Sequence, residues 1–266
     1  LGSRTGGEAL IIDPVLEKTD HYLQLLHELE LTLVKAIDTH IHADHKTALG
    51  ALRDKTHCVT VMGKKSDVDL VSMRVDDGDK IEIENIQLDV IHTPGHTIDS
   101  YSFTMTDRVF TGDTLLIRGT GRTDFQQGDN ASAYHSLFEK LLKLPDETLV
   151  YPGHDYKGDT VSTIGEEKAF NPRLQVSSVE DYAEIMDNLN LADPKMTDVA
   201  VPANLAMGLG QSDADHPDWA LTVGQLMALQ ERSEIVLVDL REDSERSTFG
   251  QIPASVHAPY GRLETL

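Results

Sequence analysis

Short apolar runs, separated by turns that contain glycine or proline, recur along the first part of the chain. Those rich in Val, Ile and Leu span residues 31–39, 86–91, 108–110 and 148–150. Their short lengths and their flanking turns predict strands. Two other segments, residues 17–30 and about 131–143, place apolar side chains along one helical face. These stripes predict helices that pack onto a core.

The run His-Ile-His-Ala-Asp-His directly follows the first of these apolar stretches. It contributes three imidazoles, from His40, His42 and His45, and the carboxylate of Asp44. A strand that ends in such a run delivers several metal donors to one point. Imidazole suits zinc and iron, and a carboxylate adds a hard, charged donor. A solvated, His-rich loop is the alternative, and it would not require further donors elsewhere.

Further donors do occur downstream, at the ends of three other predicted strands. His96 follows residues 86–91, Asp113 follows residues 108–110, and His154 follows residues 148–150. Each lies next to a glycine, which permits the tight turn and close backbone approach that a buried ion requires. The four strand ends together therefore predict a metal site.

This pattern of H-x-H-x-D-H, then H, D and H, resembles the metallo-β-lactamase superfamily over about residues 10–170. The resemblance implies an α/β fold, the αββα sandwich, in which two mixed sheets lie face to face with helices outside. It also implies that the metal lies at one open edge, where the strand-end loops converge. The superfamily includes hydrolases, oxidoreductases and nucleases, so this pattern alone does not identify the reaction.

The composition narrows the class of protein. The chain has 266 residues with a 39% hydrophobic content and no run of membrane-span length. Its net charge of −22 argues against nucleic acid and anionic membrane partners, because no basic stripe is present to neutralise phosphates. Cys58 is the single cysteine, so an intramolecular disulfide is excluded. We therefore expect a cytoplasmic, bacterial-type location and a core role for Cys58.

Three motifs narrow the reaction. They are G-R-T-D-F-Q-Q-G at residues 121–128, H-D-Y-K-G at 154–158 and N-P-R-L at 171–174. With residues 186–191 and 201–204, they resemble the persulfide dioxygenases, the ethylmalonic encephalopathy protein family, over about residues 8–208. The resemblance implies oxidation of glutathione persulfide by O₂ to sulfite and glutathione, in sulfide detoxification, at one non-haem Fe(II).

That family resemblance implies that iron is held by His40, His96 and Asp113. Two imidazoles and one carboxylate form a facial triad, which leaves three positions for water, O₂ and the substrate sulfur. The remaining donors would orient ligands and waters; they are His42, Asp44, His45 and His154.

Three residues are candidates for substrate binding: Arg122, Tyr156 and Arg173. An arginine can hold a glutathione carboxylate with two hydrogen bonds, and a tyrosine can stack or donate a hydrogen bond. For Arg122, an ion pair with a loop aspartate that only shapes the loop is the alternative. Arg173 could equally cap a helix or pair with Glu166 or Glu167.

Two other functions stay open. All seven ligand positions of the superfamily are occupied, which a dinuclear zinc hydrolase of glutathione thioesters, glyoxalase II, would need. The 121–128 and 171–174 motifs favour the dioxygenase. A non-catalytic sulfur carrier or scaffold is suggested only by the C-terminal segment, and the intact donor set counts against it.

We predict three regions: a catalytic domain at 1–210, a polar linker at 211–217 and a further segment at 218–266. The last segment resembles the first part of a rhodanese domain. No cysteine follows Cys58, so we predict that it has no sulfurtransferase activity. Residues 1–7 look like a hairpin tip whose preceding strand is absent. An Asp239–Arg241 ion pair and a homodimer, which the resemblance would allow, are further expectations.

Overall fold

The computed structural model describes residues 1–68, 71–189, 191 and 196–206, together with 238–239, 246–247, 252 and 255–257. The chain divides into two compact units, Leu1–Ala214 and Asp215–Leu266. The division falls inside the predicted linker. Among the described residues, no helix is both long enough and apolar enough to cross a membrane.

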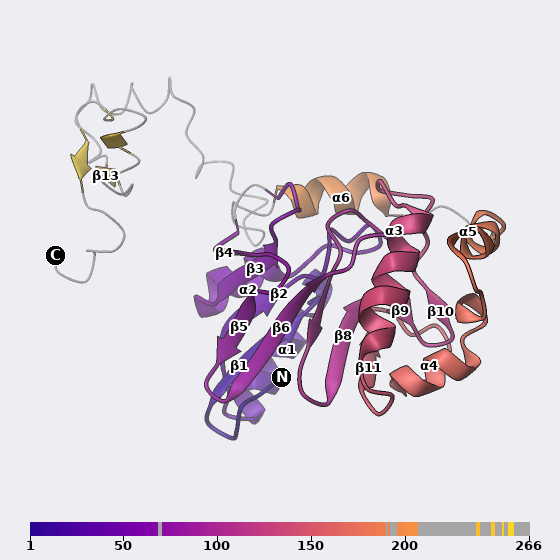
Figure 1. The fold of residues 1–266 in the computed structure, drawn as a ribbon. Helices are drawn as coiled ribbons and strands as arrows, with labels where there is room; N and C mark the ends of the chain where they lie inside the picture. Colours follow the sequence, from indigo (N-terminus) through magenta and orange to yellow (C-terminus); the bar gives the residue numbers. More distant parts are fainter. Residues whose placement is uncertain are drawn as a thin grey trace. The chain divides into compact units, whose positions relative to one another are not determined.

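The first sheet of unit 1 contains four parallel strands in sequence order (Figure 1). They are β1 (Glu8–Ile12), β2 (Thr32–Ile37), β3 (Val59–Gly63) and β4 (Met73–Val75). Parallel neighbours need a crossover connection. A 3₁₀ turn (Leu16–Lys18) and α1 (Thr19–Glu28) connect β1 to β2, and α2 (Leu49–Thr56) connects β2 to β3. The described strands of this sheet are therefore all parallel, whereas we expected a mixed sheet.

The second sheet is mixed, in the order β12-β11-β8-β7-β6-β5. Its strands are β5 (Lys80–Ile83), β6 (Ile86–His92), β7 (Tyr101–Thr104), β8 (Arg108–Gly112), β11 (Leu149–Pro152) and β12 (Ser162–Thr163). A small antiparallel pair, β9 (Leu115–Leu116) and β10 (Gly119–Thr120), follows β8. Each predicted strand is present, although its bounds differ by a few residues.

The direction of the strands explains why their polar ends meet. β6 and β8 both run antiparallel to β7, and β11 runs parallel to β8. These three strands therefore point the same way, and their C-terminal ends lie at one edge of the sheet. His96, Asp113 and His154 follow those three ends.

Three α-helices of the second half begin at side-chain caps. The predicted helix at 131–143 is a helical run of three types: α3 (Asn130–His135), a π-helical turn (Ser136–Lys140) and a 3₁₀ turn (Leu141–Lys143). Then follow α4 (Ile164–Phe170), a 3₁₀ turn (Pro172–Leu174), α5 (Val179–Asp187) and α6 (Thr197–Leu205). Asp129, Thr163 and Ser178 each accept a hydrogen bond from a first-turn backbone N–H, which satisfies a donor that the helix leaves unpaired.

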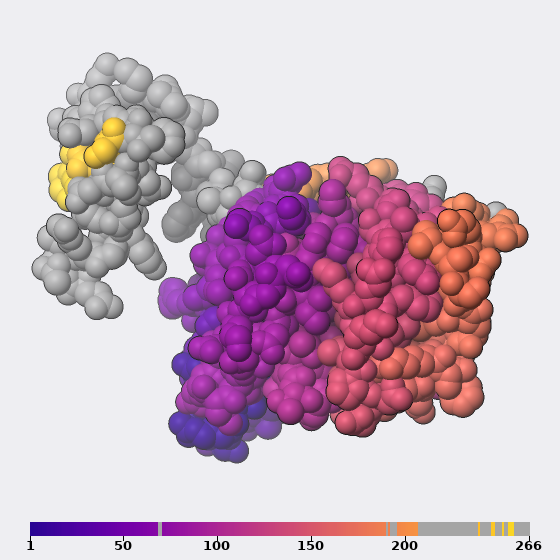
Figure 2. Space-filling model, in the orientation of Figure 1, coloured from indigo at the N-terminus to yellow at the C-terminus, as the bar shows by residue number. Residues whose placement is uncertain are grey.

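Three apolar cores define the layers. One lies between the sheets, because it combines residues of the first sheet such as Ile37 with residues of the second such as Phe103. Another joins the first sheet to the helices α1 and α2, and the third joins the second sheet to α3 and α5. This arrangement confirms the αββα sandwich. Figure 2 shows the two halves of unit 1, indigo-violet and magenta-orange, meeting along a continuous boundary.

Unit 2 has few described residues. β13 (Val238–Asp239) pairs in parallel with β14 (Val256–His257). Asp239 is buried and its Oδ2 lies 3.4 Å from Nε of Arg246. The expected partner, Arg241, lies outside the described residues, as does most of the rhodanese-like segment.

Gly95 is the turn residue on which the position of His96 depends. Its φ is +143°, and an added Cβ would lie 2.3 Å from the Cα of Ala133 in α3. We therefore expect Gly95→Ala to lower the free energy of unfolding by about 2–4 kcal/mol, through backbone strain and overlap. Urea unfolding would measure this loss.

Gly78→Ala is the matched control. Gly78 also has a positive φ of +85°, but nothing lies within 4 Å of its added Cβ. The free energy of unfolding of Gly78→Ala should fall only by the contribution of backbone strain, about 1–2 kcal/mol. Equal losses in the two variants would contradict the close contact with α3.

Candidate metal centre

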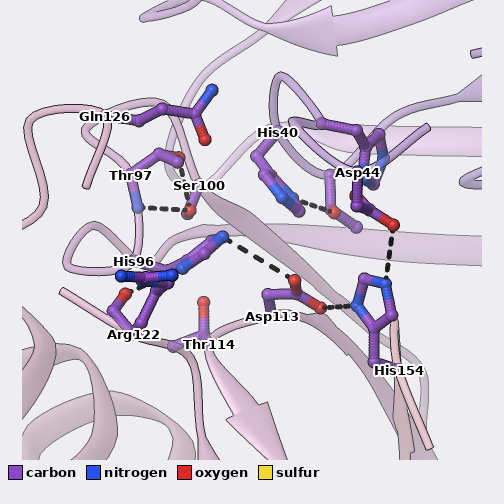
Figure 3. A network of polar contacts seen from close by, with 12 residues as sticks. His40, Asp44, His96, Thr97, Ser100, Asp113, Thr114, Arg122, Gln126 and His154 are labelled. Carbon is purple, nitrogen blue, oxygen red and sulfur yellow. Dashed lines mark hydrogen bonds and ion pairs between the residues drawn. The ribbon is translucent and has the colours of Figure 1, made fainter. Parts of the chain in front are cut away.

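Three of the predicted donors converge on one point. His40 follows β2, His96 follows β6 and Asp113 follows β8 (Figure 3). One ligand atom from each lies within 4.8 Å of the others. The His40 ring is buried, and the side chains of His96 and Asp113 are 13% and 12% exposed. The group is therefore shielded, yet it is open on one side to a cavity.

A chain of hydrogen bonds sets the tautomer of His40. The Thr39 hydroxyl donates to Oδ2 of Asp13 at 3.0 Å, since a carboxylate can only accept. That hydroxyl has one proton, so it accepts from Nδ1–H of His40 at 2.9 Å. The Nε2 lone pair of His40 therefore remains for a metal. Burial, and then the neighbouring His42, hold the pKa of His40 well below its usual value, which keeps the ring neutral.

A backbone carbonyl group orients the ring of His96, so that its Nε2 also faces the site. Its Nδ1 donates to the carbonyl oxygen of Arg122 at 2.8 Å, because a carbonyl can only accept. The Nε2 lone pair is then available, and it lies 3.7 Å from Oδ2 of Asp113, too far for a hydrogen bond. Two ligands of one ion are expected at about this separation.

His154 lies between two carboxylates and is not directed at the same point. Its Nδ1 bonds Oδ1 of Asp113 at 2.7 Å, and its Nε2 bonds Oδ2 of Asp44 at 2.9 Å. Hydrogen bonds to Asp113 and then Asp44 raise the pKa of His154 to about 11, so the ring is an imidazolium. Burial alone would raise the pKa of Asp113, but the His154 hydrogen bond and the histidine charges hold it well below its usual value.

A second group of donors lies behind the first, formed by His42, Asp44 and His45. His42 Nε2 is 3.2 Å from Oδ1 of Asp13. Burial would lower the pKa of His42, but Asp13 outweighs it and raises that pKa to about 9. His45 Nδ1 bonds Asp44 at 3.1 Å. Nδ1 of His42 and Nε2 of His45 are buried and have no hydrogen-bond partner among the described residues.

The donors of the first group fit a metal ion. Nδ1 of each imidazole is engaged by an oxygen, which leaves Nε2 toward the site, and Asp113 is ionised, as metal ligation requires. A bound ion would also give the two Nε2 atoms and Oδ2 of Asp113 a shared partner, since no hydrogen bond connects them. The site is therefore a candidate metal centre.

A cavity of about 650 Å³ opens above the centre. Its lining includes four basic side chains: Arg118, Arg122, Lys157 and Arg173. Arg118 forms an ion pair with buried Glu167. Arg122 bonds Asp124 with two nitrogens, at 2.7 and 2.9 Å. The ion pair foreseen as an alternative for Arg122 is thus present, and a substrate contact by Arg122 stays a prediction.

Arg173 and Lys157 differ from the other two cations. Arg173 donates to the backbone oxygen and hydroxyl of Thr120, and it pairs with neither Glu166 nor Glu167. No described carboxylate forms an ion pair with Arg173 or Lys157. Tyr156 is 80% exposed and stacks on His154, with the ring centroids 5.5 Å apart and an interplanar angle of 3°. Arg173, Lys157 and Tyr156 all line the cavity.

Sequence reasoning missed two supports of the centre. Asp13 follows β1, which pairs in parallel with β2, so its position beside Thr39 could have been foreseen from adjacent strand ends. Asn204 of α6 donates to the carbonyl oxygens of His42 and His45. No local sequence pattern predicts that contact, because 162 residues separate Asn204 from His42.

The charge of His154 generates a pH-dependent prediction for metal-free protein. Its folded pKa is about 11, against about 6.5 when unfolded. The stability that it contributes is fully present below the unfolded value and is lost as pH rises toward the folded value. His154→Gln should therefore cost more stability at about pH 6.5 than at about pH 9. Urea unfolding at both pH values measures this, and a constant difference would contradict it.

The comparisons agree with this geometry. Residues 4–154 match the model of the metallo-beta-lactamase superfamily. The human mitochondrial persulfide dioxygenase ETHE1 is 47% identical over 212 residues, 79% of this chain and 83% of that protein. The crystal structure of ETHE1 from Myxococcus xanthus has a TM-score of 0.76 at 51% identity, covering 78% of this chain and 92% of that one.

A hydrolase is also similar, at lower identity. A probable hydroxyacylglutathione hydrolase of Schizosaccharomyces pombe is 32% identical over 219 residues, 70% of this chain and 80% of that protein. The persulfide dioxygenases of mouse, human and cattle are 46–47% identical to this chain. The chain therefore belongs to the metallo-beta-lactamase superfamily and, within it, to the persulfide dioxygenase family.

Proposed function

We propose that this chain oxidises glutathione persulfide with O₂ to sulfite and glutathione, as part of sulfide oxidation, at one Fe(II) held by His40, His96 and Asp113. The observation that carries the proposal is the pair of Nε2 lone pairs facing the same carboxylate. Two imidazoles and one carboxylate are the donor set of non-haem Fe(II) oxygenases. When bound, iron would offer open positions for O₂ and the persulfide sulfur and would mediate electron transfer from the sulfur, which is oxidised to sulfite, to O₂, which is reduced; water supplies the third oxygen atom of sulfite.

The surrounding residues act on that donor set. Oδ1 of Asp113 is occupied by His154, which leaves Oδ2 as the metal-facing oxygen. His154 keeps its two protons between Asp113 and Asp44, so it stabilises negative charge on Asp113 without competing as a ligand. Asp13 and the Arg122 carbonyl hold the two imidazole rings in the orientation that ligation needs.

A single metal is favoured by the hydrogen bonds of the other donors. A second ion would need His154 and the group of His42, Asp44 and His45. Both ring nitrogens of His154 are engaged by carboxylates, and Nε2 of His42 is engaged by Asp13. The hydrogen bonds of His154 would have to break before this ring could bind a second ion.

The substrate's shape and charge suit the cavity. Its volume of about 650 Å³ lies in the usual range for small-ligand sites. Glutathione has two carboxylates, and Arg173 and Lys157 are the lining cations without a described acidic partner. We infer that these two bind the carboxylates, that Tyr156 stacks on or hydrogen-bonds the peptide, and that Arg122 contributes mainly through its backbone carbonyl.

The alternative is a dinuclear zinc hydrolase of glutathione thioesters. One observation favours it: the atoms of His42, Asp44 and His45 also lie within 4.8 Å of one another, and two of their nitrogens lack described partners. A hydroxide between two metals would then attack the thioester. The engaged state of His154 and the higher identity to the persulfide dioxygenases favour one iron.

We infer further that residues 218–266 form a rhodanese-like segment. The boundary of unit 2 near residue 215 and its parallel strand pair support this inference. A cytoplasmic location and a homodimer remain predictions from the sequence.

Metal content and O₂ uptake test the proposal together. Protein purified without added metal should contain about one iron per chain and should consume O₂ with glutathione persulfide. His96→Ala removes one of three ligands, so it should lose both iron and O₂ uptake. Two zinc per chain, no O₂ uptake and hydrolysis of a glutathione thioester would instead establish the hydrolase.

Arg173→Gln tests the substrate site. A charge-assisted hydrogen bond contributes about 1.5–3 kcal/mol, so KM for glutathione persulfide should rise by about tenfold or more with unchanged iron content. Arg108→Gln is the matched control, since Arg108 is bound to its neighbour Asp107 and does not line the cavity. An unchanged KM for the Arg173 variant would refute this role.

A further inference from the structure

The segment that carries the second group of donors has little regular structure of its own. Residues 41–46 form neither helix nor strand, yet His42 is buried and Ala43 is 8% exposed. Buried backbone groups require hydrogen-bond partners, and an irregular segment cannot supply them to itself. The partners of this segment therefore decide where Asp44 and His45 lie.

One side chain supplies two of these partners and a third hydrogen bond to the adjacent Thr47. Nδ2 of Asn204 donates to the carbonyl oxygen of His42 at 3.0 Å and to that of His45 at 2.9 Å. Oδ1 of Asn204 accepts from the backbone N–H of Thr47 at 2.9 Å. Both amide protons are used, so a carboxylate or an apolar side chain cannot reproduce the pattern.

Burial makes these hydrogen bonds costly to lose. Asn204 is 2% exposed and Thr47 is fully buried, so water cannot replace the amide without rearrangement. Asn204 lies on α6, far in sequence from the donor segment and next to Ala200, which is also buried. Figure 1 shows α6 along one end of the sandwich, away from the N-terminus.

Residues 41–46 are linked to the metal centre through the side chain of Asp44. Asp44 lies between the two carbonyl groups that Asn204 binds. Its Oδ2 bonds Nε2 of His154 at 2.9 Å, and Nδ1 of His154 bonds Oδ1 of Asp113 at 2.7 Å (Figure 3). A shift of the segment would therefore move Asp44, then His154, and then the Asp113 carboxylate.

We propose that Asn204 is a positioning residue of the metal centre, which acts through Asp44 and His154 to orient Asp113. The activity part of this inference rests on the proposed function. The hydrogen bonds themselves do not, because they form within the protein whichever metal binds.

Asn204→Asp and Asn204→Leu test the inference. The aspartate keeps the acceptor but opposes two carbonyl oxygens, and the leucine keeps the volume without any polar atom. Loss of such an outer partner typically costs about 10- to 100-fold in metal affinity or activity. We expect Fe(II) affinity, measured against a competing chelator, and kcat to fall within that range, with KM for glutathione persulfide changing less than about twofold.

Hydrogen exchange of the Thr47 amide gives a readout that is independent of activity. This N–H should exchange at least about tenfold faster in metal-free Asn204→Leu than in the metal-free parent protein, because its acceptor is lost. Leu142→Ala is the control for a general loss of stability: it removes a core side chain that is 8% exposed and that does not line the cavity. Its metal affinity and Thr47 exchange should stay close to those of the parent.

The outcomes separate the two proposals. If the Asn204 variants keep the affinity, kcat and Thr47 exchange of the parent, or change only as Leu142→Ala does, the positioning role is refuted. If KM rises while kcat and affinity hold, it is refuted as well. If the parent binds two zinc and consumes no O₂, the proposed function fails, while metal affinity and Thr47 exchange still test Asn204.

Discussion

The metal centre depends on the hydrogen bonds of the Asp13 carboxylate. It accepts hydrogen bonds from the backbone and hydroxyl of Thr39 at 2.7 and 3.0 Å, and it lies 3.2 Å from His42. The hydroxyl contact fixes the tautomer of His40, and the last contact engages Nε2 of His42. Burial would raise the pKa of Asp13, but His42 outweighs it and the carboxyl stays ionised. The parallel pairing of β1 and β2 places this charge where it is needed.

The second constraint is the alternation of charge around Asp113. Its two oxygens face different partners, since His154 bonds Oδ1 while His96 approaches Oδ2 without a hydrogen bond. His154 on one side and His40 and His96 on the other divide the donors around Asp113 into two groups. This division supports the proposed single metal in a donor pattern that could hold two.

The basic side chains that line the cavity also fall into two groups, paired and unpaired with a described carboxylate. Arg118 and Arg122 are tied to carboxylates of the chain, whereas Arg173 and Lys157 keep no described acidic partner. Two of the four cations can thus receive substrate carboxylates without first breaking an ion pair. The net charge of −22 makes such a basic lining a local feature of the cavity, which the overall composition does not reveal.

The sequence by itself determined that metal donors lie at four strand ends, because the spacing after each strand decides which side chains reach a sheet edge. The sandwich fold and the ligand set of His40, His96 and Asp113 followed from the family resemblance that these motifs carry. The sequence also identified the motif residues Arg122 and Arg173, but not their partners. Only the tertiary structure decided the ring tautomers, the Arg122–Asp124 pair and the parallel first sheet. It also decided the hydrogen bonds between Asn204 and the segment that carries His42, Asp44 and His45. These depend on the exact approach of segments up to 162 residues apart, and no periodicity in the chain encodes such a distance.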